Sequence, residues 1–374
     1  MTEQITIPAE LLPADGRFGC GPSKVRPEAI DALAASASSY LGTSHRQATV
    51  LFEVGALRNQ IAELFSLPDG YEVLLSNGGT TAFWDSATFG LVNDRSQHLV
   101  HGEFSSKFAT AVRKAPFLGE PEVIEAPVGD HGVAKASDGI DLYAFTQNET
   151  STGVAMPLVR PDGIDDSALV AVDATSAAGG LRFDAQQVDV YYFAPQKCLA
   201  SDGGIWIAAM SPRAIERIEQ IAATDRWCPA FLDLKTALDS SRKDQTYNTP
   251  SLATVFLANQ QLRWILDNGG LEFAAGRCDR SAEILYNWAD VHSLATPFVA
   301  DPAKRSHVVG TIDFDESVDA ARVAAVLRAN GILDTEPYRK LGRNQLRIAM
   351  FPAIEPDDVK ALTACIDYVV EQQA

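Results

Sequence analysis

The chain has 374 residues, 46% of them hydrophobic and 21% charged, and its formal net charge is −18. This length favours two domains, and the composition is typical of a globular protein. The acidic balance argues against nucleic acid and against an anionic membrane surface as partners, because both select a basic face. A protein this acidic needs a local basic pocket to bind an anion, so arginine clusters are informative here.

The N-terminal stretch MTEQITIPAELLPADG lacks the basic and long apolar regions of a signal peptide, and no apolar run approaches the roughly 20 residues of a membrane span. The five cysteines are scattered, no CxxC pair occurs, and there is no HExxH motif. We therefore expect free thiols in a cytoplasmic protein, no membrane contact and no metal site. The cysteines are Cys20, Cys198, Cys228, Cys278 and Cys365.

Strands alternate with helices through the first two thirds of the chain, which predicts an α/β domain with a mostly parallel, seven-stranded sheet. The first strand, at 71–79, precedes a helix at 80–91, and the second, at 97–104, precedes a helix at 105–115. Further strands are expected at 122–128, 141–151, 168–176, 188–197 and 204–211. In such sheets ligands gather at the carboxyl ends of the strands.

A helix at 251–270 ends at a glycine pair, and a smaller α+β unit is expected after it. Its strands are expected at 307–314 and 344–352, and its helices at 271–289, 319–331 and 356–371. We divide the chain into an N-terminal segment (1–20), a large domain (21–268) and a small C-terminal domain (269–374).

Two strand ends carry opposite charges. Asp173 ends the strand ALVAVD, and Lys197 ends VYYFAPQK, 24 residues later. Such a pair is usually a salt bridge and nothing more. The alternative is a lysine that forms a Schiff base with pyridoxal phosphate, with the aspartate beside the pyridine nitrogen. That ring is an electron sink only while its nitrogen is cationic, and a buried carboxylate favours the cationic form.

Pyridoxal phosphate also needs a phosphate cup and an aromatic ring to stack on. Gly78 and Gly79 let the backbone approach an anion, and Thr80 opens a helix whose N–H groups point at it. Phe104 ends a strand where it can stack, and Thr150 can reach the ring hydroxyl. Each has a plainer interpretation as a turn or core residue. Their order along the chain, followed by Asp173 and Lys197, makes the combined pattern strong.

Longer motifs extend this pattern over nearly the whole length. They are FGCGPSKV (18–25), GTSHR (42–46), NGGTTAFWD (77–85), NETSTGV (148–154), VDATS (172–176), APQK (194–197), YNTP (247–250) and NQLRIAMFP (344–352). On these motifs the chain resembles the phosphoserine aminotransferases, which are class V, fold-type I pyridoxal-phosphate enzymes, and is most similar to their actinobacterial branch. The resemblance implies amine transfer from L-glutamate to 3-phosphohydroxypyruvate in L-serine biosynthesis. Related enzymes also act on the pyridoxine route.

The resemblance implies a role for each motif residue around the cofactor ring. Lys197 is implied to be the Schiff-base lysine and proton shuttle, and Asp173 to pair with the pyridine nitrogen. Phe104 is implied to stack on the ring, where many relatives carry Trp, and Thr150 to bond the ring oxygen.

The same resemblance assigns the phosphate end. Gly79, Thr80 and Gln196 are implied to hold the cofactor phosphate. Asn248 and Thr249 are implied to complete the cup from the neighbouring subunit, because these enzymes are homodimers with shared active sites. Better-known relatives carry Arg at the Thr80 position, so the helix dipole or other donors must meet one charge of the phosphate.

Substrate recognition is expected to depend on arginine, whose planar fork suits carboxylate and phosphate. Arg347 is implied to bind the α-carboxylate, and His45 with Arg46 the distal phosphate or γ-carboxylate, across the dimer interface. In the family a basic pair precedes the Arg347 position, and three residues here are candidates: Arg339, Lys340 and Arg343. Cys20 stands where the family often has Ser.

Other readings stay open. A cysteine desulfurase or an alanine–glyoxylate aminotransferase shares the fold; Cys198 adjoins Lys197, but a buried, inert thiol is the plainer interpretation. The glyoxylate enzyme does not require His45 and Arg46. A non-catalytic ligand-binding relative would be expected to have lost Lys197. A Rossmann oxidoreductase lacks support, since GCGPSK has no third glycine.

Overall fold

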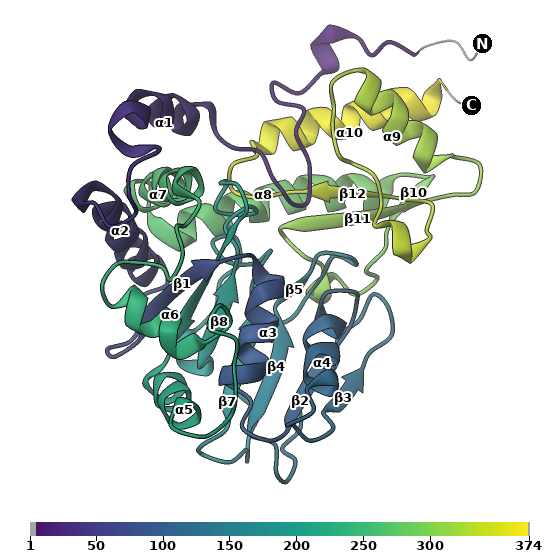
Figure 1. Ribbon diagram of the computed structural model, residues 1–374. Coiled ribbons are helices and arrows are strands. Elements are labelled where there is room, and N and C mark those ends of the chain that lie inside the picture. The colour runs from purple at the N-terminus through teal and green to yellow at the C-terminus, as the bar shows by residue number, and fades with distance from the viewer. Residues whose placement is uncertain (1–4, 373–374) are drawn as a thin grey trace.

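A seven-stranded sheet with helices on both faces forms the larger part of the computed structural model, which describes residues 5–372 (Figure 1). In sheet order the strands are β1 (Glu72–Asn77), β9 (Ile205–Met210), β8 (Val190–Phe193), β7 (Leu169–Asp173), β4 (Leu142–Thr146), β2 (Ser96–Val100) and β3 (Glu122–Glu125). Neighbours from β8 to β3 run parallel, whereas β9 is antiparallel to β1 and β8. The predicted mostly parallel, seven-stranded sheet is confirmed.

Both faces of the sheet are covered, so its central strands are buried at every position. Successive residues point to opposite faces: Tyr191 packs in one core and Tyr192 in the other. The first face carries α2 (Ala48–Leu64) and α7 (Leu252–Asp267), with α1 (Pro27–Tyr40) beside α7. The second face carries α3 (Thr80–Gly90), α4 (Ser105–Lys114), α5 (Pro212–Ala222) and α6 (Leu234–Ser241).

A second, smaller unit follows α7. It has an antiparallel sheet of β10 (Ala295–Pro297), β11 (Val309–Phe314) and β12 (Gln345–Ala349), packed with α8 (Gly270–Val291), α9 (Ala320–Ala329) and α10 (Pro356–Glu371). This matches the α+β unit expected from the sequence. The predicted boundary between 268 and 269 falls in the turn between α7 and α8; the division itself stays a prediction. Residues 1–4 of the predicted N-terminal segment and residues 373–374 of the predicted C-terminal domain lie outside the described residues.

Several element boundaries differ from the prediction. The expected strand at 97–104 stops at Val100, and Phe104 is already the cap of α4. The expected strand at 141–151 is two elements, because β4 ends at Thr146 and β5 (Asn148–Glu149) pairs instead with β6 (Val154–Ala155). Helices α1, α2, α5 and α6 and strand β10 were not predicted, nor were the short helices η1 (Ala9–Leu11), η2 (Ala185–Gln187), η3 (Pro302–Lys304) and η4 (Arg339–Leu341).

The N-terminal segment packs on the small unit although it begins the chain (Figure 1). Phe18 and Cys20 are buried in the core of that unit. The backbone N–H of Phe18 donates to the carbonyl of Leu333 at 3.2 Å, and the N–H of Ala349 donates to the carbonyl of Phe18 at 3.0 Å. These bonds fix Phe18 on the small unit, and the next residues, Cys20 and Gly21, reach the cavity at the carboxyl end of the large sheet.

No helix within residues 5–372 combines the length and the apolar composition that a membrane span requires.

Gly16 is expected to be needed for this docking. A Cβ added at Gly16 would lie 2.1 Å from the carbonyl oxygen of Gly331, which is backbone and cannot rotate away. We expect Gly16→Ala to lower the free energy of unfolding by about 1–3 kcal/mol, measured by urea denaturation. Gly276→Ala is the matched control, because the nearest atom to its added Cβ is 3.9 Å away. A wild-type unfolding midpoint for Gly16→Ala would contradict the proposed packing.

Candidate active site

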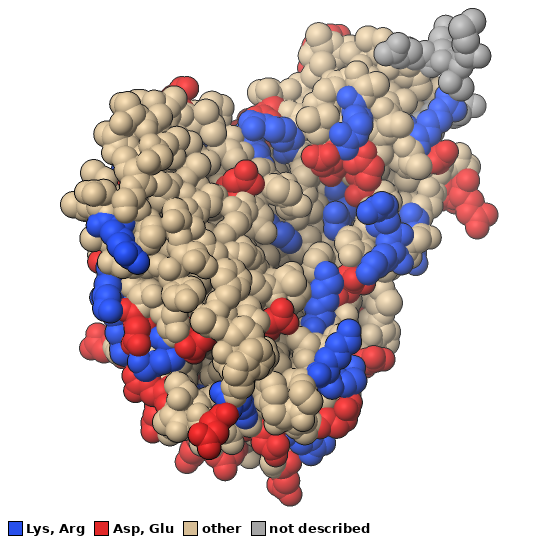
Figure 2. Space-filling view, viewed as in Figure 1, with Lys and Arg blue, Asp and Glu red and all other residues tan. Residues whose placement is uncertain are grey.

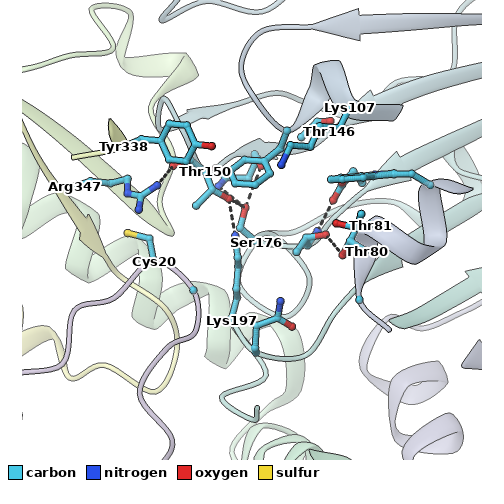
Figure 3. A pocket seen from close by; sticks show the side chains of 18 residues that line it. Cys20, Thr80, Thr81, Lys107, Thr146, Thr150, Ser176, Lys197, Tyr338 and Arg347 are labelled. Atoms are coloured by element: carbon cyan, nitrogen blue, oxygen red, sulfur yellow. Dashed lines mark hydrogen bonds between the residues drawn. The ribbon is translucent and has the colours of Figure 1, made fainter. Parts of the chain in front are cut away.

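A cavity of about 330 Å³ opens at the carboxyl ends of the parallel strands (Figure 3). Its wall combines the large sheet with the N-terminal segment and the small unit, as expected for a site at the strand ends of an α/β sheet. The predicted residues that line it are Gly79, Thr80, Phe104, Thr150, Asp173, Gln196, Lys197 and Arg347.

Lys197 lies on the turn after β8 and is 7% exposed. Its Nζ donates to Thr150 Oγ1 at 2.8 Å and lies 5.4 Å from the centroid of the Phe104 ring. Burial lowers the pKa of the Lys197 amine to about 8, with Cys20 and Asp173 acting in the opposite direction. Near neutral pH this amine is therefore divided between its neutral and charged forms.

Asp173 ends β7, the strand beside β8, and is 4% exposed. Its Oδ2 accepts from Trp84 Nε1 at 3.1 Å, and its Oδ1 accepts from the N–H of Thr175 at 2.9 Å. Burial raises the pKa of the Asp173 carboxyl, and hydrogen bonds from Thr175 and Trp84 and the charge of Lys197 oppose that rise. A carboxylate held this deep favours a cationic partner in the cavity.

The start of α3 forms the opposite end of the cavity. Gly79 is the cap of this helix, and no side chain caps it, so its first N–H groups are available to an anion. Thr80 Oγ1 lies 2.7 Å from Thr175 Oγ1. Gln196 Oε1 is buried without a hydrogen-bond partner in the described part of the chain. The free N–H groups at the start of α3 make this end able to receive an anionic group.

Arg347, on β12, brings a positive charge from the small unit into the cavity. Its Nη1 donates to the carbonyl of Thr150 at 3.2 Å, and its guanidinium lies 5.4 Å from the ring centroid of Tyr338. Its Nε is buried without a partner among residues 5–372. Figure 3 shows Arg347, Tyr338 and Cys20 together on one side of the cavity, across from Thr80 and Thr81.

The three basic candidates near Arg347 differ in their pairing. Lys340 pairs with Glu103, and Arg343 pairs with Asp313. Arg339 is exposed and has no ion pair in the range that the structure describes.

The four remaining predicted residues do not line the cavity of their own chain. His45 and Arg46 lie between α1 and α2, and Asn248 and Thr249 lie before α7. The two loops meet, since Thr249 Oγ1 lies 3.0 Å from His45 Nδ1. Arg46, Asn248 and Thr249 are exposed.

Several lining residues were not predicted. Trp84 bonds Asp173, and Ser176 Oγ accepts from Thr150 Oγ1 at 2.9 Å. The sequence near each of them could have indicated a place in the site. Trp84 follows Thr80 by one helical turn, and Ser176 belongs to the VDATS motif with Asp173. Tyr338 and Lys107 had no such signal; Lys107 Nζ lies 4.8 Å from the Phe104 ring centroid.

The donors and acceptors of this cavity fit pyridoxal phosphate. The uncapped start of α3 suits the phosphate, Asp173 suits a cationic ring nitrogen, and a partly neutral Lys197 suits an aldehyde. No cluster of three His, Cys, Asp or Glu side chains within residues 5–372 is arranged to hold a metal ion.

The family model for aminotransferase class V matches residues 18–335. The chain is 60% identical to a phosphoserine aminotransferase of a Nocardioides species, covering 99% of this chain and 100% of that protein. It is 58% identical to a phosphoserine aminotransferase of Corynebacterium glutamicum, covering 99% and 98%.

Solved structures have the same fold. A phosphoserine aminotransferase from Cytophaga hutchinsonii matches with a TM-score of 0.84 at 22% identity, covering 95% of this chain and 99% of that one. A pyridoxal-phosphate-bound phosphoserine aminotransferase from Trichomonas vaginalis matches with a TM-score of 0.80 at 18% identity, covering 94% and 99%.

The lowered pKa of Lys197 predicts how cofactor uptake depends on pH. Only the neutral amine attacks an aldehyde, so the rate at which the cofactor-free protein takes up pyridoxal phosphate should rise with pH and level off above about 8. An amine with the ordinary lysine pKa of about 10.4 would keep gaining rate well beyond that point. Stopped-flow absorbance measures the rate, and Lys197→Ala is the control. Continued gain above about pH 9 would contradict the burial argument.

Proposed function

Because this chain belongs to the class-V aminotransferases, and within them to the phosphoserine aminotransferases, we propose that it moves an amino group from L-glutamate to 3-phosphohydroxypyruvate. The products are 2-oxoglutarate and O-phospho-L-serine, in the biosynthesis of L-serine. The family resemblance, the aminotransferase activity and pyridoxal phosphate as the cofactor were predicted from the motifs, and the relatives confirm them. The two substrates remain our proposal.

The observation that carries the proposal is the placing of Asp173 and Lys197. They are buried at the ends of neighbouring parallel strands and share a cavity with Arg347. A salt bridge alone does not account for them, because Lys197 Nζ donates to Thr150 and Asp173 is met by Trp84 and Thr175. Two ionisable groups with shifted pKa values in one cavity are typical of a catalytic site.

When bound, pyridoxal phosphate supplies an aldehyde that takes up an amine and a ring that accepts the electron pair of a bond to the substrate Cα. Gly79 and Thr80, at the start of α3, would hold its phosphate, together with Gln196 from the turn after β8. Asp173, Phe104 and Thr150 would hold its ring.

Lys197 is the residue that moves the proton. Its pKa of about 8 lets the amine accept a proton from the substrate Cα and return it near neutral pH. Arg347 would bind the α-carboxylate of either substrate with its planar fork, and it lies close enough to Thr150 to hold that carboxylate beside the Lys197 amine. The same residues serve both half-reactions, because glutamate and the phosphorylated product are both α-amino acids.

The distal phosphate of 3-phosphohydroxypyruvate and the γ-carboxylate of glutamate need further cations. We assign the binding of this distal group to Arg339 and to His45 and Arg46 of a second copy. Arg339 is the one of the three basic candidates without an ion pair within residues 5–372. His45, Arg46, Asn248 and Thr249 meet at the surface and do not reach the cavity of their own chain. A homodimer in which each copy completes the other's site explains both facts.

The surface around these loops suits a second copy. Leu41, Phe52 and Tyr247, each within a few residues of these loops in the chain, are exposed large apolar side chains. The region over α1 and α7 is largely without charge in Figure 2, whereas acidic side chains gather over the lower part of the molecule. Burial of such apolar side chains is the usual drive for association.

The structure gives little support to the alternative of a cysteine desulfurase with the same fold. Cys198, the desulfurase candidate, is buried; burial raises the pKa of its thiol well above the ordinary value, and Sγ donates to the carbonyl of Ser176. A thiol in this state is unreactive. We also propose a cytoplasmic location, which suits the five free cysteines, and cell fractionation tests it.

The proposed activity is tested by following O-phosphoserine formation from glutamate and 3-phosphohydroxypyruvate. We expect Lys197→Ala to lower kcat by about 10²–10⁴-fold, because the proton shuttle is lost. Borohydride reduction of the cofactor-loaded protein should attach the cofactor to the peptide around Lys197. If the wild-type protein forms no O-phosphoserine, or the label falls elsewhere, the proposal is wrong.

The distal-anion sites are tested with matched arginine variants. We expect Arg46→Ala and Arg339→Ala to lower kcat/KM for 3-phosphohydroxypyruvate by about 10²-fold, because each removes a charged hydrogen bond to the phosphate, while cofactor affinity is kept. Arg343→Ala is the control, since Asp313 already holds that guanidinium. Equal losses in all three variants would contradict the assignment.

Mixing two inactive variants tests the shared site directly. In a mixed dimer of Lys197→Ala and Arg46→Ala chains, one site has both residues intact. Because half of randomly formed dimers are mixed, about a quarter of the wild-type activity should return. A mixture no more active than its components would rule out a contribution of Arg46 across the interface.

A further inference from the structure

A buried carboxylate lies behind the cavity wall and does not line the cavity. Glu149, on β5, is fully buried and accepts hydrogen bonds from three backbone N–H groups and one hydroxyl. The N–H of Phe104 reaches its two oxygens at 3.1 and 3.3 Å, and the N–H of Ser105 reaches Oε2 at 2.9 Å. The N–H and Oγ of Ser151 reach Oε1 at 3.2 and 2.6 Å.

These donors are what allow a negative charge to stay inside the protein. Glu149 has no ion-pair partner within residues 5–372, and an unpaired buried carboxylate is otherwise very costly. Phe104 is the cap of α4, so the carboxylate sits at the start of this ten-residue helix, where the helix dipole favours an anion. The charge therefore fixes the backbone that carries the Phe104 ring.

Gly102 makes room for this carboxylate. A Cβ added at Gly102 would lie 2.4 Å from Glu149 Cγ and 2.5 Å from its Cδ. Any side chain at this position would therefore displace Glu149 or the backbone leading to Phe104. Ser151 Oγ adds a brace, since it accepts from the N–H of Glu103 at 3.1 Å while donating to Glu149.

We propose that Glu149 is a positioning residue that holds the Phe104 ring against the cofactor, with Gly102 providing the space it needs. The inference rests on the proposed function, because it concerns the pyridoxal-phosphate site. The Phe104 ring is only partly buried, so core packing fixes it less than it fixes the neighbouring Ser105 and Phe108. Its backbone N–H, tied to Glu149, supplies the missing constraint.

Glu149→Gln is the informative substitution because it keeps the size of the side chain. Every group that hydrogen-bonds to the Glu149 carboxylate is a donor, and a carboxamide offers one acceptor oxygen and one NH₂ group. At least one backbone N–H then faces another donor. Loss of a hydrogen bond to a charged group costs enough to weaken binding about tenfold.

The test is a double-mutant cycle between Glu149 and Phe104, measured on the cofactor-free full-length protein titrated with pyridoxal phosphate. The dissociation constant and the visible circular dichroism of the bound cofactor are recorded, so the readout does not depend on activity. We expect Glu149→Gln to raise the dissociation constant about tenfold in the wild-type background and less than about twofold in the Phe104→Ala background. The circular dichroism band should weaken only in the first case.

An equal effect of Glu149→Gln in both backgrounds would overturn the proposal, because a purely structural residue acts whether or not the ring is present. Gly102→Ala should also weaken cofactor binding more in the wild-type background than in the Phe104→Ala background. It replaces Glu149→Gln in the double-mutant cycle if that variant does not fold. Gly119→Ala, whose added Cβ meets nothing closer than 3.6 Å, should bind as wild type. If the wild-type protein itself takes up no pyridoxal phosphate, the proposed function fails rather than the positioning role alone.

Discussion

The site depends on keeping two ionisable side chains out of water at the ends of adjacent parallel strands. Burial moves the pKa of Lys197 down and that of Asp173 up, so both shifts favour the neutral forms. Cys20 and Asp173 oppose the shift of Lys197, whose Nζ donates to Thr150, and hydrogen bonds from Trp84 and Thr175 oppose the shift of Asp173. In our proposal, Lys197 in this state exchanges a proton near neutral pH, and Asp173 holds a cationic ring.

The short segment 148–151 connects the parts of this site. Asn148 Nδ2 donates to Ser176 Oγ, Glu149 holds the start of α4, and Thr150 meets Lys197 through its hydroxyl and Arg347 through its carbonyl. The segment can do this because β4 ends at Thr146 and the chain leaves the main sheet. A strand continued to residue 151 would have used these backbone groups in the sheet ladder.

The cavity wall is assembled from parts far apart in the chain. Cys20 at the end of the N-terminal segment and the adjacent Gly21 form one part of the wall, and the small unit brings Arg347 and Tyr338. Gly21 packs so closely on Lys197 that an added Cβ would lie 2.6 Å from its Cε. In our proposal a second copy adds His45 and Arg46, so the acidic chain places a local group of cations around one small anionic substrate.

The sequence by itself determined the sheet, the small unit and the position of Asp173 and Lys197 at the strand ends. These features are local: strand and helix periodicity, and residue types such as Asp173 and Lys197 at the end of an apolar run, are read within a few positions. Only the tertiary structure decided that the strand at 141–151 breaks, that Glu149 lies under Phe104, and that Tyr338 joins the wall. It also decided that His45 and Thr249 meet away from their own cavity. Such contacts join residues tens to hundreds of positions apart, and they depend on how the elements pack and which polar groups burial forces together.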